Sequence, residues 1–102
     1  PTRELIRLYE RWGRSGAALL ITGNVMVDRR ALGEPGNVVV EDDRDSSLLA
    51  RWARAARAEG AQAWLQINHP GRQSPPNLSR EPVAPSAVLS TVQALLDKLT
   101  MA

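Results

Sequence analysis

Two short apolar runs alternate with amphipathic segments, and this alternation constrains the fold more than any other feature of the sequence. Residues 17–22 read Ala-Ala-Leu-Leu-Ile-Thr, a continuous apolar run typical of a strand that is buried on both faces. Gly23 and Asn24 are expected to end it, and residues 61–68 form a second strand candidate. Since strands that alternate with helices build βαβ units, the pattern predicts an α/β fold with a parallel sheet.

Amphipathic segments precede and separate these runs. The first helix is predicted over residues 2–13, with Thr2 as its N-cap and Gly13 or Gly16 at its end. A second helix is predicted over residues 47–59, where small and apolar side chains recur at helical spacing. The apolar face of the first helix is expected to consist of Leu5, Leu8, Tyr9 and Trp12.

The remaining segments are predicted to be mostly irregular. Residues 28–45 contain glycine, proline and an acidic run, and residues 38–40 within them are expected to pair briefly without forming a core strand. Residues 69–85 are rich in proline and therefore read as loop. A last helical pattern covers residues 88–99.

The predicted order of elements is helix, strand, helix, strand, helix, with a weak repeat of roughly 40–45 residues. This is the unit that a (β/α)8 barrel, or TIM barrel, repeats eight times. Two buried parallel strands would leave apolar, unpaired edges, which native sheets avoid. We therefore expect residues 1–102 to be a single incomplete segment of a larger barrel domain, or to associate with another chain. That other chain could be a second copy of the same chain, which would make a homo-oligomer.

Composition excludes several classes of function. The chain has 102 residues, no cysteine and a formal net charge of +2, almost all of its positive charge being arginine. Without cysteine it has neither a disulfide framework nor a thiolate metal site, which fits a reducing cytoplasm. No apolar run approaches the ~20 residues that span a bilayer. The arginines at helical spacing near the N-terminus are interspersed with Glu4 and Glu10, so a solvated helix face is favoured over a nucleic-acid surface.

Polar residues directly follow both predicted strands, at the end where α/β barrels form their sites. The first strand leads into Gly23 and Asn24. In the second, Trp64, Gln66 and Asn68 share one face because side chains alternate along a strand. The Gln66 amide offers both a donor and an acceptor, which suits the imide-like edge of an aromatic cofactor.

These motifs carry a family resemblance. Residues 18–24 (Ala-Leu-Leu-Ile-Thr-Gly-Asn), followed by residues 64–72 (Trp-Leu-Gln-Ile-Asn-His-Pro-Gly-Arg), resemble the second and third barrel strands of the old yellow enzyme, or NADH:flavin oxidoreductase, family. The Gly-Glu-Pro-Gly loop at residues 33–36 and the segment at residues 80–87 fit the same family. The resemblance implies an FMN-dependent barrel enzyme that takes hydride from NADH or NADPH and passes it to an electron-poor alkene or a related small-molecule substrate.

The resemblance also implies roles for individual residues. Gln66 matches the glutamine that binds the pyrimidine edge of FMN, and Asn24, with Gly23, matches the part of the second strand that approaches the flavin. Asn68 matches a position in the substrate pocket where the family often has an aromatic residue, so this asparagine is a departure from the pattern. His69 and Arg72 match a His-x-Gly-Arg motif beside that pocket. No catalytic residue or proton donor is assigned.

Plainer interpretations stand beside these. Gln66 could simply satisfy a hydrogen bond at a strand end, and a lone loop histidine such as His69 is more often structural than catalytic. Arg72 is equally suited to anchoring its loop or binding an anion. Asp42 and Asp43 are expected to be a solvated loop rather than an acid/base pair, because nothing apolar surrounds them. Trp12, Trp52 and Trp64 are expected to be core residues.

Two alternatives to the enzyme remain open at this point. The chain is either a non-catalytic truncated product or association-dependent fragment without independent activity, or an arginine-rich interaction module whose binding face runs from Arg3 to Arg14. In every case we predict that the isolated chain does not bind FMN stoichiometrically, because most of the flavin's partners in the family lie on other strands.

Overall fold

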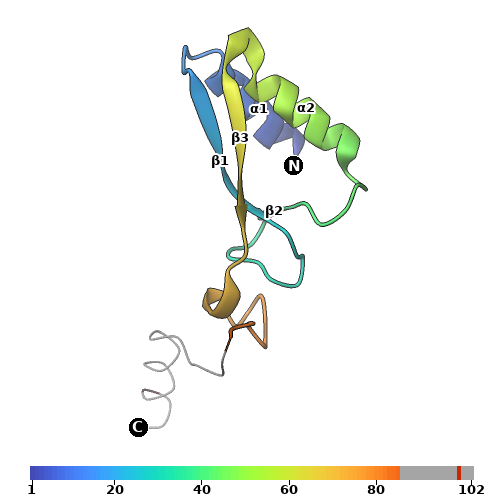
Figure 1. Cartoon of the computed structure of the whole chain (residues 1–102), viewed down its shortest axis with the longest axis vertical. Coiled ribbons are helices and arrows are strands. Elements are labelled where there is room, and N and C mark those ends of the chain that lie inside the picture. The colour runs from blue at the N-terminus through green and yellow to red at the C-terminus, as the bar shows by residue number, and fades with distance from the viewer. Residues whose placement is uncertain (86–98, 100–102) are drawn as a thin grey trace.

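Two helices cover one face of a three-stranded parallel sheet (Figure 1). This computed structural model describes residues 1–85 and Leu99. The order of strands in the sheet is β2-β1-β3. The predicted α/β class and parallel pairing are confirmed, whereas a closed barrel stays a prediction. The elements in chain order are α1 Arg3–Gly13, β1 Leu19–Met26, β2 Val38–Val39, α2 Ser46–Ala56 and β3 Gln62–Asn68.

Helix α1 begins at the predicted N-cap. The hydroxyl of Thr2 accepts a hydrogen bond from the backbone N–H of Leu5 at 3.1 Å. The predicted apolar face of α1 is confirmed at Tyr9, which is buried, and at Leu5, which packs against the core. It is wrong at Leu8 and Trp12, which are exposed, while Ile6 is buried instead. The absence of a side chain at Gly13 leaves room for the backbone of α2.

Helix α2 is shorter than the predicted residues 47–59. It ends at Ala56, and a separate 3-10 turn, η1, covers Ala58–Gly60. Glu59 has a φ of 60° and Gly60 a φ of 90°, so the chain leaves the right-handed helical region before the predicted end. The left-handed turn reverses the chain into β3.

The core lies between the two helices and the sheet. Tyr9 and Trp52 pack edge to face with their ring centroids 5.1 Å apart. Trp52 is buried, as expected from the sequence. The cluster of buried residues consists of Ile6, Tyr9, Val25, Trp52 and Ala56, so α1, β1 and α2 all contribute to it. No helix within the described residues is long and apolar enough to cross a membrane.

Strand β1 continues beyond the predicted end at Thr22. It runs from Leu19 to Met26, and Gly23 and Asn24 lie inside it. Pairing with β3 shifts register between Ile21, which lies opposite Trp64, and Asn24, which lies opposite Gln66. Two residues of β1 therefore lie opposite one residue of β3, which is a β-bulge. Gly23 and Asn24, which were expected to end the strand, lie within it at the bulge instead.

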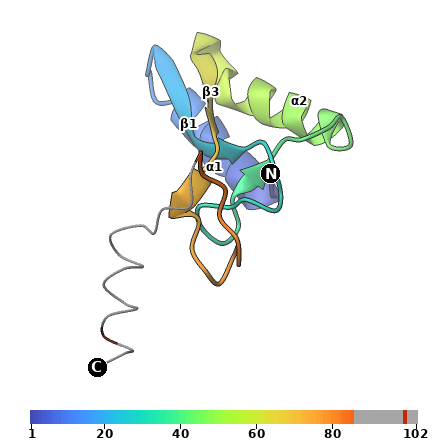
Figure 2. The same cartoon turned by 60° about the horizontal axis from the view of Figure 1, so that its bottom comes forward.

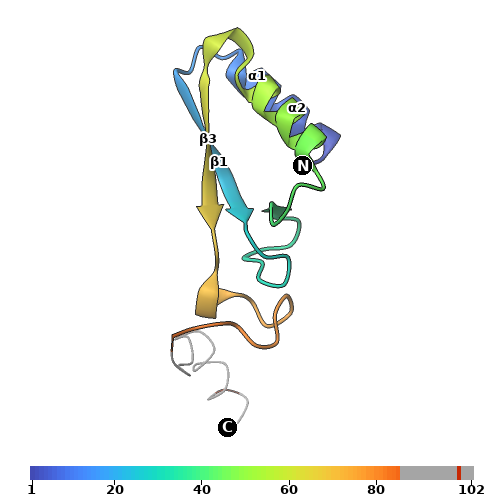
Figure 3. The same ribbon diagram turned by 45° about the vertical axis from the view of Figure 1, so that its right-hand side comes forward.

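Within residues 1–85, no helix lies against the second face of the sheet, which is called the helix-free face below (Figure 3). Trp64 lies on this helix-free face and is 61% exposed, and Ile21 is exposed beside it. The prediction that Trp64 and Trp12 are core residues is wrong for the described chain, since Trp12 is also 45% exposed. Trp12 nevertheless packs its ring against Tyr9, with the ring centroids 5.0 Å apart.

Strand β2 is the brief pairing expected within residues 38–40. Val38 and Val39 lie opposite Val25 and Met26 in parallel, and the pairing stops after these two residues. The loops that follow β1 and β3 gather beyond the same end of the sheet (Figure 2). The predicted helix over residues 88–99 lies outside the described residues, apart from Leu99.

Candidate functional site

Asn24 and Gln66 form a hydrogen-bonded amide pair across the two long strands. The Nε2 of Gln66 donates to the Oδ1 of Asn24 at 2.8 Å. The two residues are register partners in the β1–β3 ladder, near the carboxyl ends of both strands. Gln66 shares its strand face with exposed Trp64, so the pair lies on the helix-free face. Two residues that the sequence separates by about forty positions are thus brought together.

The bulge is what places Asn24 on that face. Leu20 packs against the core, and strict alternation would send Thr22 and Asn24 to the same side. The extra residue at the bulge reverses the alternation, so that Thr22 and Val25 are both buried and Asn24 lies beside Gln66. Asn24 is presented to the open face because β1 is irregular.

Two hydroxyl groups bond to the backbone at the bulge. The Thr22 hydroxyl oxygen accepts from the backbone N–H of Gln66 at 2.9 Å. The Tyr9 hydroxyl oxygen accepts from the backbone N–H of Gly23 at 3.1 Å. The N–H of Gly23, one of the predicted flavin contacts, is therefore directed at α1 rather than at a ligand. Sequence reasoning missed Tyr9 and Thr22; the one signal was that a buried tyrosine usually needs a hydrogen-bond partner.

His69 and Arg72 lie on the turn that follows β3. The Nδ1 of His69 accepts from the backbone N–H of Gly71 at 3.0 Å, which closes the turn. Gly71 has a φ of 56°, as the motif required of it. Arg72 is exposed on the short 3-10 helix η2, Gly71–Gln73. In the described structure His69 thus has a structural contact, in line with its plainer interpretation.

Among the cavities found within the described residues, His69 and Arg72 line different ones, and Asn68 lines neither of these two. His69 lines a cavity of about 460 Å³ together with Asp28 and Arg30. Arg72 lines a neighbouring cavity of about 450 Å³ against Val83. Asn68 remains on β3, half-buried and opposite Met26. The two cavities lie in the loops beyond the sheet.

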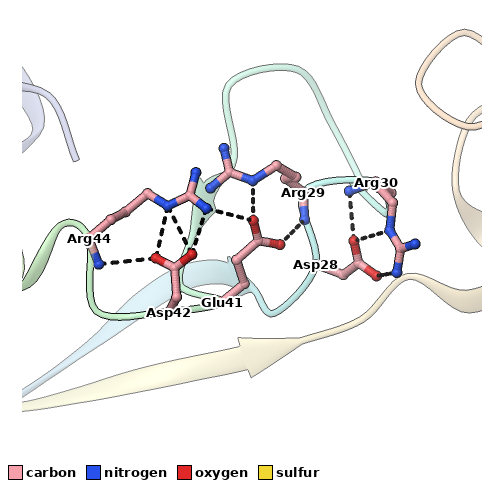
Figure 4. Close-up of polar contacts among 6 residues, drawn as sticks. All are labelled: Asp28, Arg29, Arg30, Glu41, Asp42 and Arg44. Carbon is pink, nitrogen blue, oxygen red and sulfur yellow. Dashed lines mark hydrogen bonds and ion pairs between the residues drawn. The ribbon is translucent and has the colours of Figure 1, made fainter.

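Three arginine–carboxylate pairs organise the loops between β1 and α2 (Figure 4). Arg30 binds both carboxylate oxygens of Asp28, at 3.0 Å from Nε and 2.8 Å from a terminal nitrogen. This hydrogen bonding by Arg30 lowers the pKa of Asp28 to about 2. The hydrogen bond from Arg29 lowers the pKa of Glu41 in the same way. These carboxylates are held ionised and are poor candidates for general acids.

Asp42 belongs to the same network. The guanidinium of Arg44 binds its carboxylate, with the shortest contact at 2.6 Å, and this hydrogen bonding lowers the pKa of Asp42. A charged hydrogen-bonding partner, rather than apolar surroundings, perturbs this carboxylate. The expectation of a solvated loop and not an acid/base pair agrees with these contacts. Among the described residues, no three histidine or acidic side chains converge as metal ligands would.

Comparison with known proteins identifies relatives of this chain. It is 40% identical over 93 residues to the NADH-dependent flavin oxidoreductase nadA of Aspergillus parasiticus, a match that covers 86% of this chain and 21% of the relative. It is 39% identical over 79 residues to the NADH-dependent flavin oxidoreductase iliE of Hypocrea jecorina, covering 74% and 20%. The chain therefore spans about a fifth of the length of these relatives.

A bacterial relative extends the comparison. The chain is 38% identical over 90 residues to the NADH:fumarate oxidoreductase of Klebsiella pneumoniae, covering 85% of this chain and 10% of that protein. No family model matches the chain. In open α/β sheets, ligands bind outside the carboxyl ends of the strands, which is the end of the sheet where Asn24 and Gln66 lie. The relatives show that the chain belongs to the NADH:flavin oxidoreductase family, as its motifs predicted.

Proposed function

We propose that this chain supplies the Asn24–Gln66 part of the flavin site in an FMN-dependent NADH oxidoreductase. The observation that carries the proposal is the amide pair on the helix-free face, joined by a 2.8 Å hydrogen bond. The names of the relatives support a flavin and NADH as the reacting groups. FMN rather than another flavin is the expectation from the family's motifs.

The residues present fit the edge of a flavin. Gln66 donates one side-chain N–H to Asn24. Its carbonyl oxygen and second N–H, together with the amide NH2 of Asn24, can therefore face a ligand. A planar imide presents alternating acceptors and a donor, which such a pair of amides can match. The bound flavin would supply reversible hydride transfer, and the role of this chain is to bind and orient it.

The substrate that we propose is an electron-poor alkene or a related acceptor, with NADH as the hydride donor and NADPH as the alternative. Asn68, His69 and Arg72 are the candidates for contact with that substrate. Arg72 is exposed and cationic, so it could bind an anionic group on the acceptor. We place the reaction in the cytoplasm, which the absence of cysteine fits.

A second candidate role is association without independent catalysis. Its support is the apolar area on the helix-free face, where Ile21 is 57% and Trp64 is 61% exposed. A parallel sheet is normally covered on both faces, so this face calls for a partner. Another copy of the chain or further strands of a barrel would each provide one.

Titration with FMN tests the proposal. Because the chain covers a fifth of its relatives, we expect weak binding, which NMR detects at high flavin concentration. FMN should shift the side-chain amide resonances of Asn24 and Gln66. In Gln66→Leu, where only the Asn24 amide is left to report, FMN should no longer shift it. Gln62→Leu is the matched control, since Gln62 is exposed on the same face at the other end of β3. Shifts that are absent, or that survive Gln66→Leu unchanged, would refute the proposal.

A further inference from the structure

The β-bulge in β1 needs an explanation, because an irregular strand in a parallel sheet leaves backbone groups out of the ladder. Thr22 and Gly23 together lie opposite Leu65, between the regular pairs on either side. A bulge that is not held in place could relax to a regular register. In that register the alternation would turn the Asn24 side chain toward the helices and away from Gln66.

Two buried hydroxyls hold the bulge from different elements. The Thr22 hydroxyl lies within the break and accepts from Gln66 N–H, which belongs to the same residue as the amide of the site. The Tyr9 hydroxyl comes from α1 and accepts a hydrogen bond from the backbone N–H of Gly23, which lies within the bulge. Both side chains are almost fully buried, Tyr9 at 5% and Thr22 at 6% exposure. Each bond thus joins a buried side chain to the backbone of a residue that is exposed.

Tyr9 is itself held rigidly. Its ring packs edge to face on Trp52 and Trp12, with centroids 5.1 Å and 5.0 Å away. The position of its hydroxyl is thereby tied to both helices. Through the Tyr9 hydroxyl, the packing of the two helices thus fixes the position of the Gly23 backbone in β1.

We infer that Tyr9 and Thr22 are positioning residues, whose hydroxyls fix the β1 bulge and so aim the side chain of Asn24 at Gln66. Neither side chain belongs to the amide pair: Tyr9 acts through the backbone of Gly23, and Thr22 acts through the backbone of Gln66. The bearing of this inference on flavin binding rests on the proposed function, whereas the geometry of the amide pair can be tested without flavin.

The test uses three hydroxyl deletions in the full chain: Tyr9→Phe, Thr22→Val and, as control, Ser74→Ala. Ser74 is a suitable control because its buried hydroxyl also bonds to the backbone, donating to the carbonyl of Leu32 at 2.7 Å. NMR would record the side-chain amide resonances of Asn24 and Gln66 and the hydrogen exchange of Gly23 and Gln66. Thermal unfolding of each variant separates loss of stability from loss of positioning.

Tyr9→Phe should accelerate exchange of the Gly23 amide about tenfold, the effect of one lost hydrogen bond, and Thr22→Val should do the same for Gln66. Both should displace the Asn24 and Gln66 side-chain resonances. Ser74→Ala should leave them unchanged even where it lowers the unfolding temperature. Thr22→Ser retains a hydroxyl and should keep the wild-type pattern.

Unchanged side-chain resonances in folded Tyr9→Phe and Thr22→Val would overturn the inference. If one variant fails to fold, the other decides. Adding FMN distinguishes the two proposals. Failure of the wild-type chain to respond counts against the proposed function alone, because the flavin-free spectra already decide the positioning role. A wild-type response that both variants retain in full would overturn the positioning role and leave the proposed function standing.

Discussion

Gly13 of α1 lies directly against the main chain of Ala56 in α2: a β-carbon added to Gly13 would lie 2.6 Å from the Ala56 carbonyl oxygen. The obstacle is backbone, which cannot rotate away. We expect Gly13→Ala to destabilise the chain by about 1–3 kcal/mol through overpacking. This exceeds the gain in helix propensity of about 1 kcal/mol. Denaturant unfolding followed by circular dichroism measures the difference.

Gly23 provides the control for that substitution. A β-carbon there would meet nothing within 4 Å, and its φ is not in the left-handed region. Gly23→Ala should change the free energy of unfolding by no more than about 0.5 kcal/mol. Equal effects of the two substitutions would contradict the close approach of the helices.

The two helices differ at their N-termini. Thr2 accepts a hydrogen bond from Leu5, whereas the N-cap of α2, Asp45, makes no side-chain capping bond. We expect Thr2→Ala to cost about 1 kcal/mol of stability, as the loss of a working cap does. Asp45→Ala should cost clearly less. Unfolding curves of both variants at neutral pH decide the point, and a larger cost at Asp45 would speak against the capping geometry.

Substitutions of the buried and the exposed tryptophans should differ in their effect on stability. Trp52 is 4% exposed in the core, and Trp64 is 61% exposed on the helix-free face. Trp52→Ala is expected to cost about 3–5 kcal/mol, because it leaves a cavity in the core. Trp64→Ala should cost much less in the monomeric chain. A large loss for Trp64 would indicate that this face is covered in solution, and sedimentation of the wild-type chain would then identify self-association.

Acid should loosen the loop after β1 at a defined pH. The pKa of Asp28 is lowered from 3.8 to about 2, first by the hydrogen bond from Arg30. A carboxylate with a lowered pKa contributes stability that is present above its unfolded pKa and is lost as the pH falls toward the folded value. The stability that the Asp28–Arg30 contact contributes should therefore be fully present at pH 5 and should fall between about pH 4 and pH 2.

The Nε resonance of Arg30 reports this contact in an NMR titration. In the wild-type chain it should move with a midpoint near pH 2, and in Asp28→Asn this transition should disappear. Asp43→Asn is the control, because Asp43 is absent from the ion pairs found among the described residues. A midpoint near pH 4 would show that the two side chains do not pair in solution. Because both groups are exposed, global stability should change little.

The helices and strands were predictable where local chemistry decides them. Thr2 could be identified as a cap from its residue type and from the pattern that follows it, and the structure confirms it. The parallel pairing followed from the alternation of apolar runs and helical segments. The extent of β1 did not follow, since Gly23 and Asn24 favour a turn when only their neighbours are considered. Pairing with β3 overrides that local preference.

The site was predictable only in part, and for the same reason. Asn24 and Gln66 were selected by their position after apolar runs and by resemblance. Their direct bond depends on a register shift that no local pattern encodes. The buried face of α1 was predicted only in part, because Gly13 contributes nothing to hydrophobic periodicity, yet its missing side chain leaves room for the backbone of Ala56. Long-range packing decides both features.

The bulge makes β1 one residue longer than the stretch of β3 with which it pairs. Removing Gly23 would leave Ile21, Thr22 and Asn24 opposite Trp64, Leu65 and Gln66 in regular alternation, so Asn24 would stay beside Gln66 and Val25 would stay in the core. A residue lost from a regular part of β1 would instead exchange the two faces of the strand for everything beyond it. A single lost codon would thus remove the irregularity at one position and turn the strand inside out at the next.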